Sequence, residues 1–189
     1  MVRLVAVAAL LSAGLLVLPL PQTAQVRGTA AGQPDLSRIR ILAVAPFYDE
    51  VYAPDLAALG GVRVSELAAR GPIRIVPPGE VAREMQRLGI SPAALVSPTS
   101  TVAVGRAVGA DAVLTGRITL AIRESDRDRD EQPLGGGIYS RVDASIRVLE
   151  VPTRLTLFHE TFICTAPASL EVAMDCLARD VVRRLGLGR

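Results

Sequence analysis

The sequence predicts an α/β fold, a mixed sheet of about five strands with helices packed on it, in the order β-α-β-α-α-β-β-β-α. Three observations lead to this prediction. Residues 39–45 are apolar on both alternating faces, as in a strand that is covered on both sides. Residues 112–123 and 139–151 alternate between apolar and polar side chains, as in strands with one dry face. The tail from Pro167 carries an apolar stripe at helical spacing.

The first half of the chain alternates short strands with helices. The strand 39–45 ends at Pro46, because proline cannot donate to a strand ladder. A helix is predicted within 54–70 and stops at Gly71-Pro72, after which 73–76 forms a second short strand. A connection of helical length between strands favours parallel pairing.

Two further helices follow. Val81, Met85 and Leu88 share one helical face in residues 79–88. The hydroxyl groups around Ser97 are suited to cap a helix over 102–108.

The second half predicts a three-stranded antiparallel meander and a closing helix. In 112–123 the apolar face is predicted to hold Ala112, Leu114, Ile118, Leu120 and Ile122, and the polar face Thr115, Arg117, Thr119 and Arg123. In 139–151 the polar face holds Arg141, Asp143, Ser145 and Arg147. The last strand covers 155–164. The tail then places Leu170, Ala173, Met174, Leu177, Val181 and Leu185 on one helical stripe.

The N-terminal residues indicate export. Arg3 precedes the uncharged residues 4–18, which as a helix would span about 22 Å, short of the ~30 Å of a bilayer core. This pattern is typical of a signal peptide, although an uncleaved anchor stays an alternative. We therefore divide the chain into a signal peptide with the start of a linker (1–31), a linker (32–38) and a single α/β domain (39–187). The exported protein is expected to be secreted, and periplasmic in a bacterium with two membranes, with membrane association only peripheral or through an uncleaved signal segment.

The charge of the chain argues against one class of partner, nucleic acids. The formal net charge is only +2, and the basic residues, all of them arginine, are scattered along the chain. A nucleic-acid-binding surface would need basic residues clustered on one face, so we expect no nucleic-acid partner.

The chain has two cysteines, Cys164 and Cys176. In an oxidising compartment such a pair favours a disulfide bridge, which would close a short loop. Two independent buried thiols are the alternative.

Residues 124–137 are rich in charge and glycine, and four acidic residues lie within 126–131. Arg127 and Arg129 compensate these charges, and the spacing of a calcium loop is absent. A solvated hairpin tip is therefore the preferred interpretation over a metal site.

Sequence motifs for catalysis are absent. The single histidine, His159, stands in the middle of the last predicted strand between Phe158 and Glu160. A lone histidine cannot make a zinc site without other ligands, and neither cysteine lies next to it, which favours a structural or interfacial role. Asp49 and Glu50 form the one acidic pair at the carboxyl end of a strand, where α/β proteins often bind ligands. Acidic residues at this position also commonly form turns. We expect no catalytic residue, no metal and no cofactor, and keep a hydrolase around this pair as a minor hypothesis.

Four short segments carry a resemblance to known proteins: "ILAVAPF" (41–47), "IRIVPPGEV" (73–81), "LGI" (88–90) and "GRAVGADAVLTGRI" (105–118). Together they resemble the bacterial envelope group that includes the N-terminal domain of TolB, the curli secretion channel CsgG and the PelC-type ring proteins. In that group an opening strand ends in Pro-Phe, and a later helix leads into Gly-Ala-Asp-x-x-x-x-Gly, here Gly109 to Gly116.

The resemblance spans about residues 39–187 and implies a role in envelope assembly, secretion or transport without catalysis. The chain departs from the curli channel, because no cysteine precedes Cys164 and the loop at 124–137 is short and charged. It also lacks residues for the propeller of TolB. Envelope proteins and other copies of the chain are thus the expected partners.

Two surfaces are candidates for these contacts. The loop 47–52 gathers the aromatic and acidic residues Phe47, Tyr48, Asp49, Glu50 and Tyr52, which would suit a contact surface or, alternatively, a locally packed corner. The polar sheet face, with Arg117, Thr119, Arg123, Arg141, Asp143 and Arg147, would suit an interface between protomers or a surface open to solvent. A second function hypothesis is a small-ligand-binding protein that uses the loop after the first strand.

Overall fold

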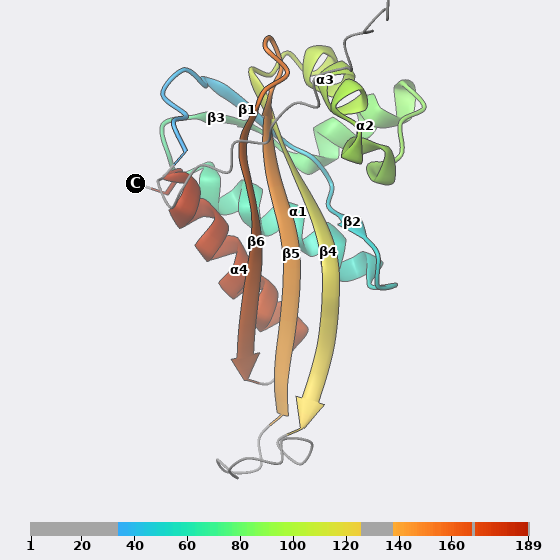
Figure 1. Cartoon of the computed structure of the whole chain (residues 1–189), viewed down its shortest axis with the longest axis vertical. Coiled ribbons are helices and arrows are strands. Elements are labelled where there is room, and N and C mark those ends of the chain that lie inside the picture. Colours follow the sequence, from blue (N-terminus) through green and yellow to red (C-terminus); the bar gives the residue numbers. More distant parts are fainter. Residues whose placement is uncertain (1–33, 126–137, 168, 189) are drawn as a thin grey trace, which may run out of the picture.

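A six-stranded mixed sheet organises the fold (Figure 1). The computed structural model describes residues 34–125, 138–167 and 169–188. The strands are β1 (Ile41–Val44), β2 (Tyr48–Asp49), β3 (Arg74–Val76), β4 (Ala112–Ser125), β5 (Ile138–Glu150) and β6 (Thr156–Pro167). Their order in the sheet is β3-β1-β4-β5-β6, and β2 pairs separately with β4.

The helices are α1 (Pro54–Ala68), α2 (Pro78–Arg87), the short 3₁₀ helix η1 (Pro92–Val96), α3 (Pro98–Ala107) and α4 (Leu170–Leu185). Proline stands in the first turn of α1, α2, η1 and α3, where its missing N–H costs no helical hydrogen bond. The helix α4 begins after Ser169, whose side chain accepts from the N–H of Val172, and ends at Gly186 with φ 69°.

The predicted fold class and element order are confirmed. The pairs β1–β3 and β1–β4 are parallel, and β4–β5–β6 is an antiparallel meander. The sequence did not predict β2, which has only two residues and follows directly on the loop after Pro46. The division into signal peptide, linker and domain stays a prediction, and residues 1–33 and the charged segment 126–137 lie outside the described residues.

Helices cover both faces of the sheet. On one face α1 and α4 pack over inward side chains of β1, β4, β5 and β6, for example Leu42, Leu114 and Ile146. On the other face α2, η1 and α3 cover only the upper end of the sheet, over Ala43, Val113 and others. None of the described helices covers the lower part of the meander on this second face (Figure 1).

The Gly-Ala-Asp motif has a structural explanation. Gly109, with φ 67°, ends α3 in the left-handed conformation that glycine adopts without strain. The carboxylate Oδ2 of Asp111 then accepts from the backbone N–H groups of Arg40 at 2.9 Å and Ile41 at 3.0 Å. The motif therefore fixes the start of β1 against β4.

Among the described helices, none combines the length and the apolar composition that crossing a membrane would require.

Candidate protein interaction surface

The loop after β1 turns its first aromatic residue into the core. Phe47 is only 4% exposed and packs between α1 and β4. A Cβ atom added at Gly116 would lie 2.6 Å from three atoms of this ring, and one added at Gly60 would lie 2.8 Å from it. The prediction that Phe47 contributes to a contact surface is therefore wrong, because the two glycines leave room for the ring inside the protein.

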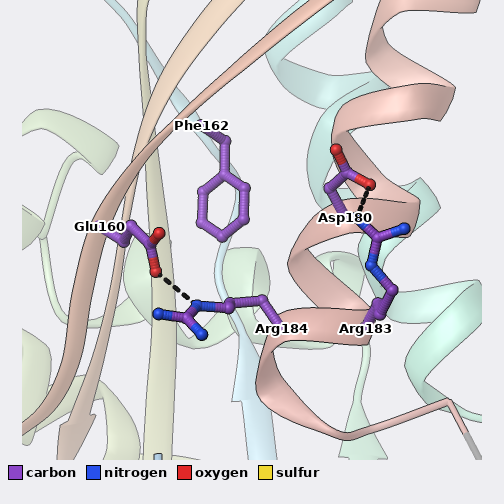
Figure 2. A pocket seen from close by; sticks show the side chains of 5 residues that line it. All are labelled: Glu160, Phe162, Asp180, Arg183 and Arg184. Atoms are coloured by element: carbon purple, nitrogen blue, oxygen red, sulfur yellow. Dashed lines mark hydrogen bonds and ion pairs between the residues drawn. The ribbon is translucent and has the colours of Figure 1, made fainter. Parts of the chain in front are cut away.

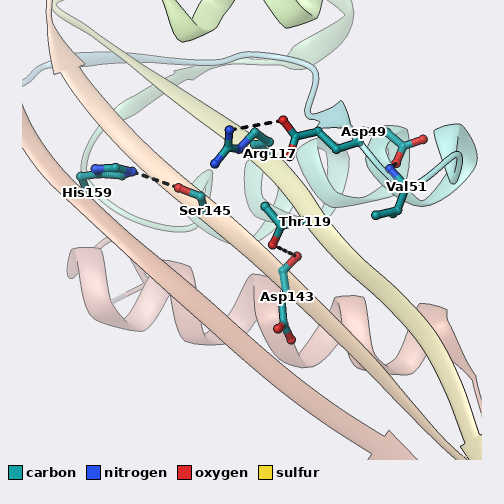
Figure 3. Close-up of polar contacts among 8 residues, drawn as sticks. Asp49, Val51, Arg117, Thr119, Asp143, Ser145 and His159 are labelled. Carbon is teal, nitrogen blue, oxygen red and sulfur yellow. Dashed lines mark hydrogen bonds and ion pairs between the residues drawn. The ribbon is translucent and has the colours of Figure 1, made fainter.

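The acidic pair in this loop is engaged in local contacts. The carboxylate Oδ1 of Asp49 accepts from the N–H of Val51 at 2.7 Å, and its Oδ2 accepts from the N–H of Ala53. Glu50 Oε1 lies 3.3 Å from Arg117 Nη1 in an ion pair. Figure 3 shows Asp49 turned toward Val51. Each carboxylate has its own partner, and this arrangement argues against the hydrolase hypothesis, which needs the two to work together.

The last residues of the loop face solvent. Tyr48 is half-buried in β2, where it pairs with Arg117. Tyr52 is 98% exposed and has φ 58°, the left-handed region that a bulky residue rarely adopts. The two hydrogen bonds of Asp49 hold the turn that contains it. Tyr52 is thus an exposed aromatic side chain in a turn that Asp49 closes.

The second candidate is the uncovered face of the lower meander, which we call the open sheet face. In the middle of this face, the residues that lie opposite each other on neighbouring strands are polar. Arg141 donates two hydrogen bonds of 2.8 Å to the carboxylate of Asp143. Ser145 Oγ lies 2.9 Å from His159 Nε2 (Figure 3). The residues on this face are Arg117, Leu120, Ile122, Arg141, Asp143, Ser145, His159, Thr161, Ile163 and Thr165.

A β-bulge in β4 changes which residues belong to this face. Ile118 pairs with Ala144, but Leu120 pairs with Asp143, so Thr119 is the extra residue. Thr119 donates from its hydroxyl to the carbonyl of Asp143 at 3.3 Å. Beyond the bulge the alternation is reversed.

The reversal corrects the predicted placement of Arg123. This residue pairs with Ser140, which lies on the face that α4 covers. Hydrogen bonds from Ser169 and from the N–H of Glu171 itself lower the pKa of Glu171, and the charge of Arg123 lowers it further. Arg123 is thus oriented toward the start of α4, while Leu120 and Ile122 replace it on the open sheet face.

Arg147 also has a role that the pattern did not indicate. Its Nη1 donates to the carbonyl of Val96 at 2.9 Å, and its Nη2 donates to the carbonyl of Leu95 and to Thr101 Oγ1. Burial lowers the pKa of its guanidinium. Arg147 therefore anchors η1 and α3 to the sheet and is not available as an interface residue.

The pair Ser145–His159 is the one contact on this surface that has the composition of a nucleophile and a base. The pair lies on the open sheet face, where His159 is exposed and Ser145 is half-buried (Figure 3). In the described part of the chain no carboxylate is hydrogen-bonded to the His159 ring, so nothing there orients it as a base. This geometry favours the predicted structural or interfacial role of His159.

The two cysteines lie between β6 and α4. Cys164 and Cys176 are joined by a disulfide, with their Cα atoms 6.1 Å apart, within the usual range for a bridge. Asp180 Oδ2 lies 3.6 Å from Cys164 Sγ. These three residues are close enough to hold a metal ion, but sulfur atoms that are bonded to each other do not offer the thiolates that a metal would need.

A hollow of about 390 Å³ opens beside the bridge, between β6 and the end of α4 (Figure 2). Its charged side chains pair with one another. Arg184 Nε lies 2.8 Å from Glu160 Oε2, and Arg183 Nη2 lies 2.7 Å from Asp180 Oδ1. Phe162 forms the remaining wall. The hollow therefore presents paired charges and no converging reactive groups.

A second hollow, of about 440 Å³, lies where the N-terminal segment of the described chain meets the end of α4. Its lining is mostly apolar and comes from three separate parts of the sequence: Pro34, Leu36, Ser37, Ile39, Arg40, Pro72, Ile73, Leu185, Gly186 and Leu187. Sequence reasoning did not predict this hollow, because no local pattern brings these segments together.

These features of the described residues define a class by fold: an α/β protein with a long antiparallel meander and helices on both faces of a mixed sheet. No protein-family model matches the sequence, and no curated protein matches it. Solved structures do share the fold. The lipoprotein GNA1162 from Neisseria meningitidis superposes with a TM-score of 0.54 at 17% identity, over 77% of this chain and 97% of that one.

Two further structures are similar. A variant of the PelC dodecamer from Paraburkholderia phytofirmans has a TM-score of 0.52 at 17% identity, covering 82% of this chain and 94% of that one. The hypothetical protein CT253 from Chlamydia trachomatis has a TM-score of 0.51 at 15% identity, covering 77% and 94%. At these identities the likeness establishes the fold. The predicted resemblance to PelC is thus confirmed at the level of the fold, while the TolB and curli-channel parts stay predictions.

Proposed function

We propose that the chain is a non-catalytic accessory module of the bacterial cell envelope, which acts through contacts with envelope proteins and through self-association. The observation that carries the proposal is the shared fold with a lipoprotein and with a protein that forms a dodecamer. A fold does not by itself transfer a function, so the surfaces of this chain must supply the rest of the argument.

The open sheet face supports a role in binding. Its middle holds ordered polar pairs, Arg141–Asp143 and Ser145–His159, and its lower part shows Leu120, Ile122 and Ile163. Ile163 is 57% exposed. A face with an apolar part and a polar part resembles the composition of protein interfaces more than that of a catalytic cleft.

The polar groups also support a role without catalysis. In the described part of the chain, the carboxylates that could form an acid–base pair are engaged in turns or ion pairs, as with Asp49 and Glu50. The bridged cysteines leave neither thiol available as a nucleophile. The chemistry that remains is recognition.

Two measurements on the full-length gene product test the proposal. Fractionation of the native cells should recover the protein with the envelope or the periplasm. Light scattering coupled to size-exclusion chromatography of the purified protein should give a mass several times that of one chain. Recovery in the cytoplasm would refute the envelope role, and a single-chain mass at high micromolar concentration would refute self-association.

A further inference from the structure

Tyr52 projects from the surface, and we call this side chain the knob. It is the most exposed of the large apolar and aromatic side chains described, at 98%, and it precedes Ala53, the N-cap residue of α1. Its backbone is held at φ 58° by a turn in which Asp49 accepts from the N–H groups on both sides of Tyr52, those of Val51 and Ala53. A strained backbone at an exposed aromatic residue indicates that its presentation has a use beyond packing.

The hollow of about 440 Å³, which we call the socket, has a size and polarity that suit a tyrosine side chain. Its floor holds the buried side chains of Leu36, Ile39 and Leu187. A tyrosine ring has about 150–250 Å² of surface to bury, and a largely apolar hollow of this volume can accept it. Arg40 lines the hollow and offers a guanidinium to the ring face or to the tyrosine hydroxyl.

The knob and the socket lie at opposite ends of α1. Tyr52 precedes Pro54, the first residue of the helix, and Pro72 and Ile73 of the socket follow its last residue, Ala68. The 15 residues of α1 separate the two ends by about 22 Å. In Figure 1 the turn between β2 and α1 lies at the right of the molecule, and the C-terminal end of α4 lies at the left. One chain therefore cannot place its own Tyr52 in its own socket.

The two ends also carry opposite charge. Beside the knob, Glu50 and Asp55 are exposed, and Arg117 is the partner of Glu50. Arg40 is the charged residue in the described lining of the socket, and the exposed residues next to its lining segments in the sequence are mostly basic: Arg38, Arg70 and Arg74, with Asp35 acidic. An acidic knob and a basic rim attract each other when two copies lie side by side in the same orientation.

We propose that Tyr52 of one copy inserts into the socket of the next copy, so that the knob and the socket form a repeating head-to-tail contact. The contact deepens the self-association in the proposed function and rests on it. Because the two surfaces differ, the contact is heterologous and generates a closed ring when the rotation between copies closes. Tyr52 supplies the central anchor, and the charged rims add area and fix the orientation.

Substitution of the knob gives the first test. Tyr52→Ala in the full-length protein should weaken self-association at least about 30-fold, measured by sedimentation velocity over a concentration series. The matched control is Leu155→Ala, an apolar side chain 61% exposed in the turn between β5 and β6, which should leave the mass unchanged. Circular dichroism should show that both variants keep the fold.

Cysteine pairing gives the second test. A Tyr52→Cys chain and a Ser37→Cys chain are mixed and oxidised, since Ser37 is an exposed residue of the socket and the native cysteines are bridged. A covalent dimer should form in the mixture and not with either variant alone.

Three results would overturn the inference. Cross-linking of Tyr52→Cys chains with each other would mean a symmetric contact around the knob. An oligomer that survives Tyr52→Ala, with no cross-link in the mixture, would place the contact elsewhere and leave the proposed function standing. A wild-type protein that stays a single chain would remove both the contact and self-association.

Discussion

Replacing Gly116 by alanine should destabilise the fold, because the added methyl group meets Phe47. The new Cβ would lie 2.6 Å from three ring atoms, and contacts below 3.0 Å force a displacement. The ring cannot simply retreat, since on its other side Gly60 leaves equally little room, with a Cβ position 2.8 Å away. Overpacking of this kind costs about 1–3 kcal/mol, and we expect the upper end of that range.

The assay is a double-mutant cycle followed by urea unfolding and by thermal melts in circular dichroism. A loss of about 3 kcal/mol should lower the melting temperature by roughly 6–12 °C for a domain of this size. Phe47→Ala alone should cost about 3–5 kcal/mol through the cavity that it leaves. In that background Gly116→Ala should cost close to nothing, because the methyl group then enters empty space.

A second glycine provides the control. An added Cβ at Gly79 meets nothing within 4 Å, and this residue lies in the first turn of α2. Gly79→Ala should therefore stabilise the protein by a few tenths to about 1 kcal/mol. If Gly116→Ala stays within about 0.5 kcal/mol of the wild type, or costs the same with and without the Phe47 ring, the packing argument is refuted.

Four other outcomes are expected. Tyr52→Gly should abolish the mass increase on self-association, and in dilute protein, where the wild type is also a single chain, it should raise the melting temperature by relieving up to about 1 kcal/mol of left-handed strain; a lower melting temperature of the single chain would contradict this. Reduction of Cys164–Cys176 should cost about 3 kcal/mol in urea unfolding, and two free thiols titrated in the unreduced native protein would disprove the bridge. Arg147→Met should cost about 1–3 kcal/mol, because the carbonyl of Val96 loses its donor and the carbonyl of Leu95 keeps only the hydroxyl of Thr101, and unchanged stability would contradict the anchoring role. Asp111→Ala should cost about 1–3 kcal/mol in urea unfolding, since two backbone N–H groups at the start of β1 lose their acceptor, whereas an unchanged midpoint would mean that water replaces it.

The sequence predicts the elements whose pattern is long and regular. The alternation in β5 and the apolar stripe of α4 each extend over several turns or residue pairs, so that single exceptions do not hide them. The two-residue strand β2 is too short to show a period, and it was missed. The fold class follows from the regular elements, and the structure confirms it.

The candidate surface was less predictable, because it depends on contacts between distant residues. Arg147 lies on the polar side of its strand as expected, but only the position of η1 shows that its guanidinium is already engaged. In the sequence, Phe47 is one of three aromatic residues near the acidic pair. Only the contacts of its ring with Gly60 and Gly116 show that it is buried. The density of aromatic residues did point to Tyr52, while its socket joins three segments that no local pattern connects.

The extra residue Thr119 reverses which alternate side chains of β4 face outward. Upstream of it odd-numbered side chains such as Thr115 and Arg117 look outward, and downstream the even-numbered Leu120 and Ile122 do so. Deleting this single threonine would leave the composition of the strand almost intact, yet it would turn two aliphatic groups inward and bring the guanidinium of Arg123 out. Whether the lower meander presents apolar or charged side chains on its open face thus depends on the length of β4 as much as on its composition.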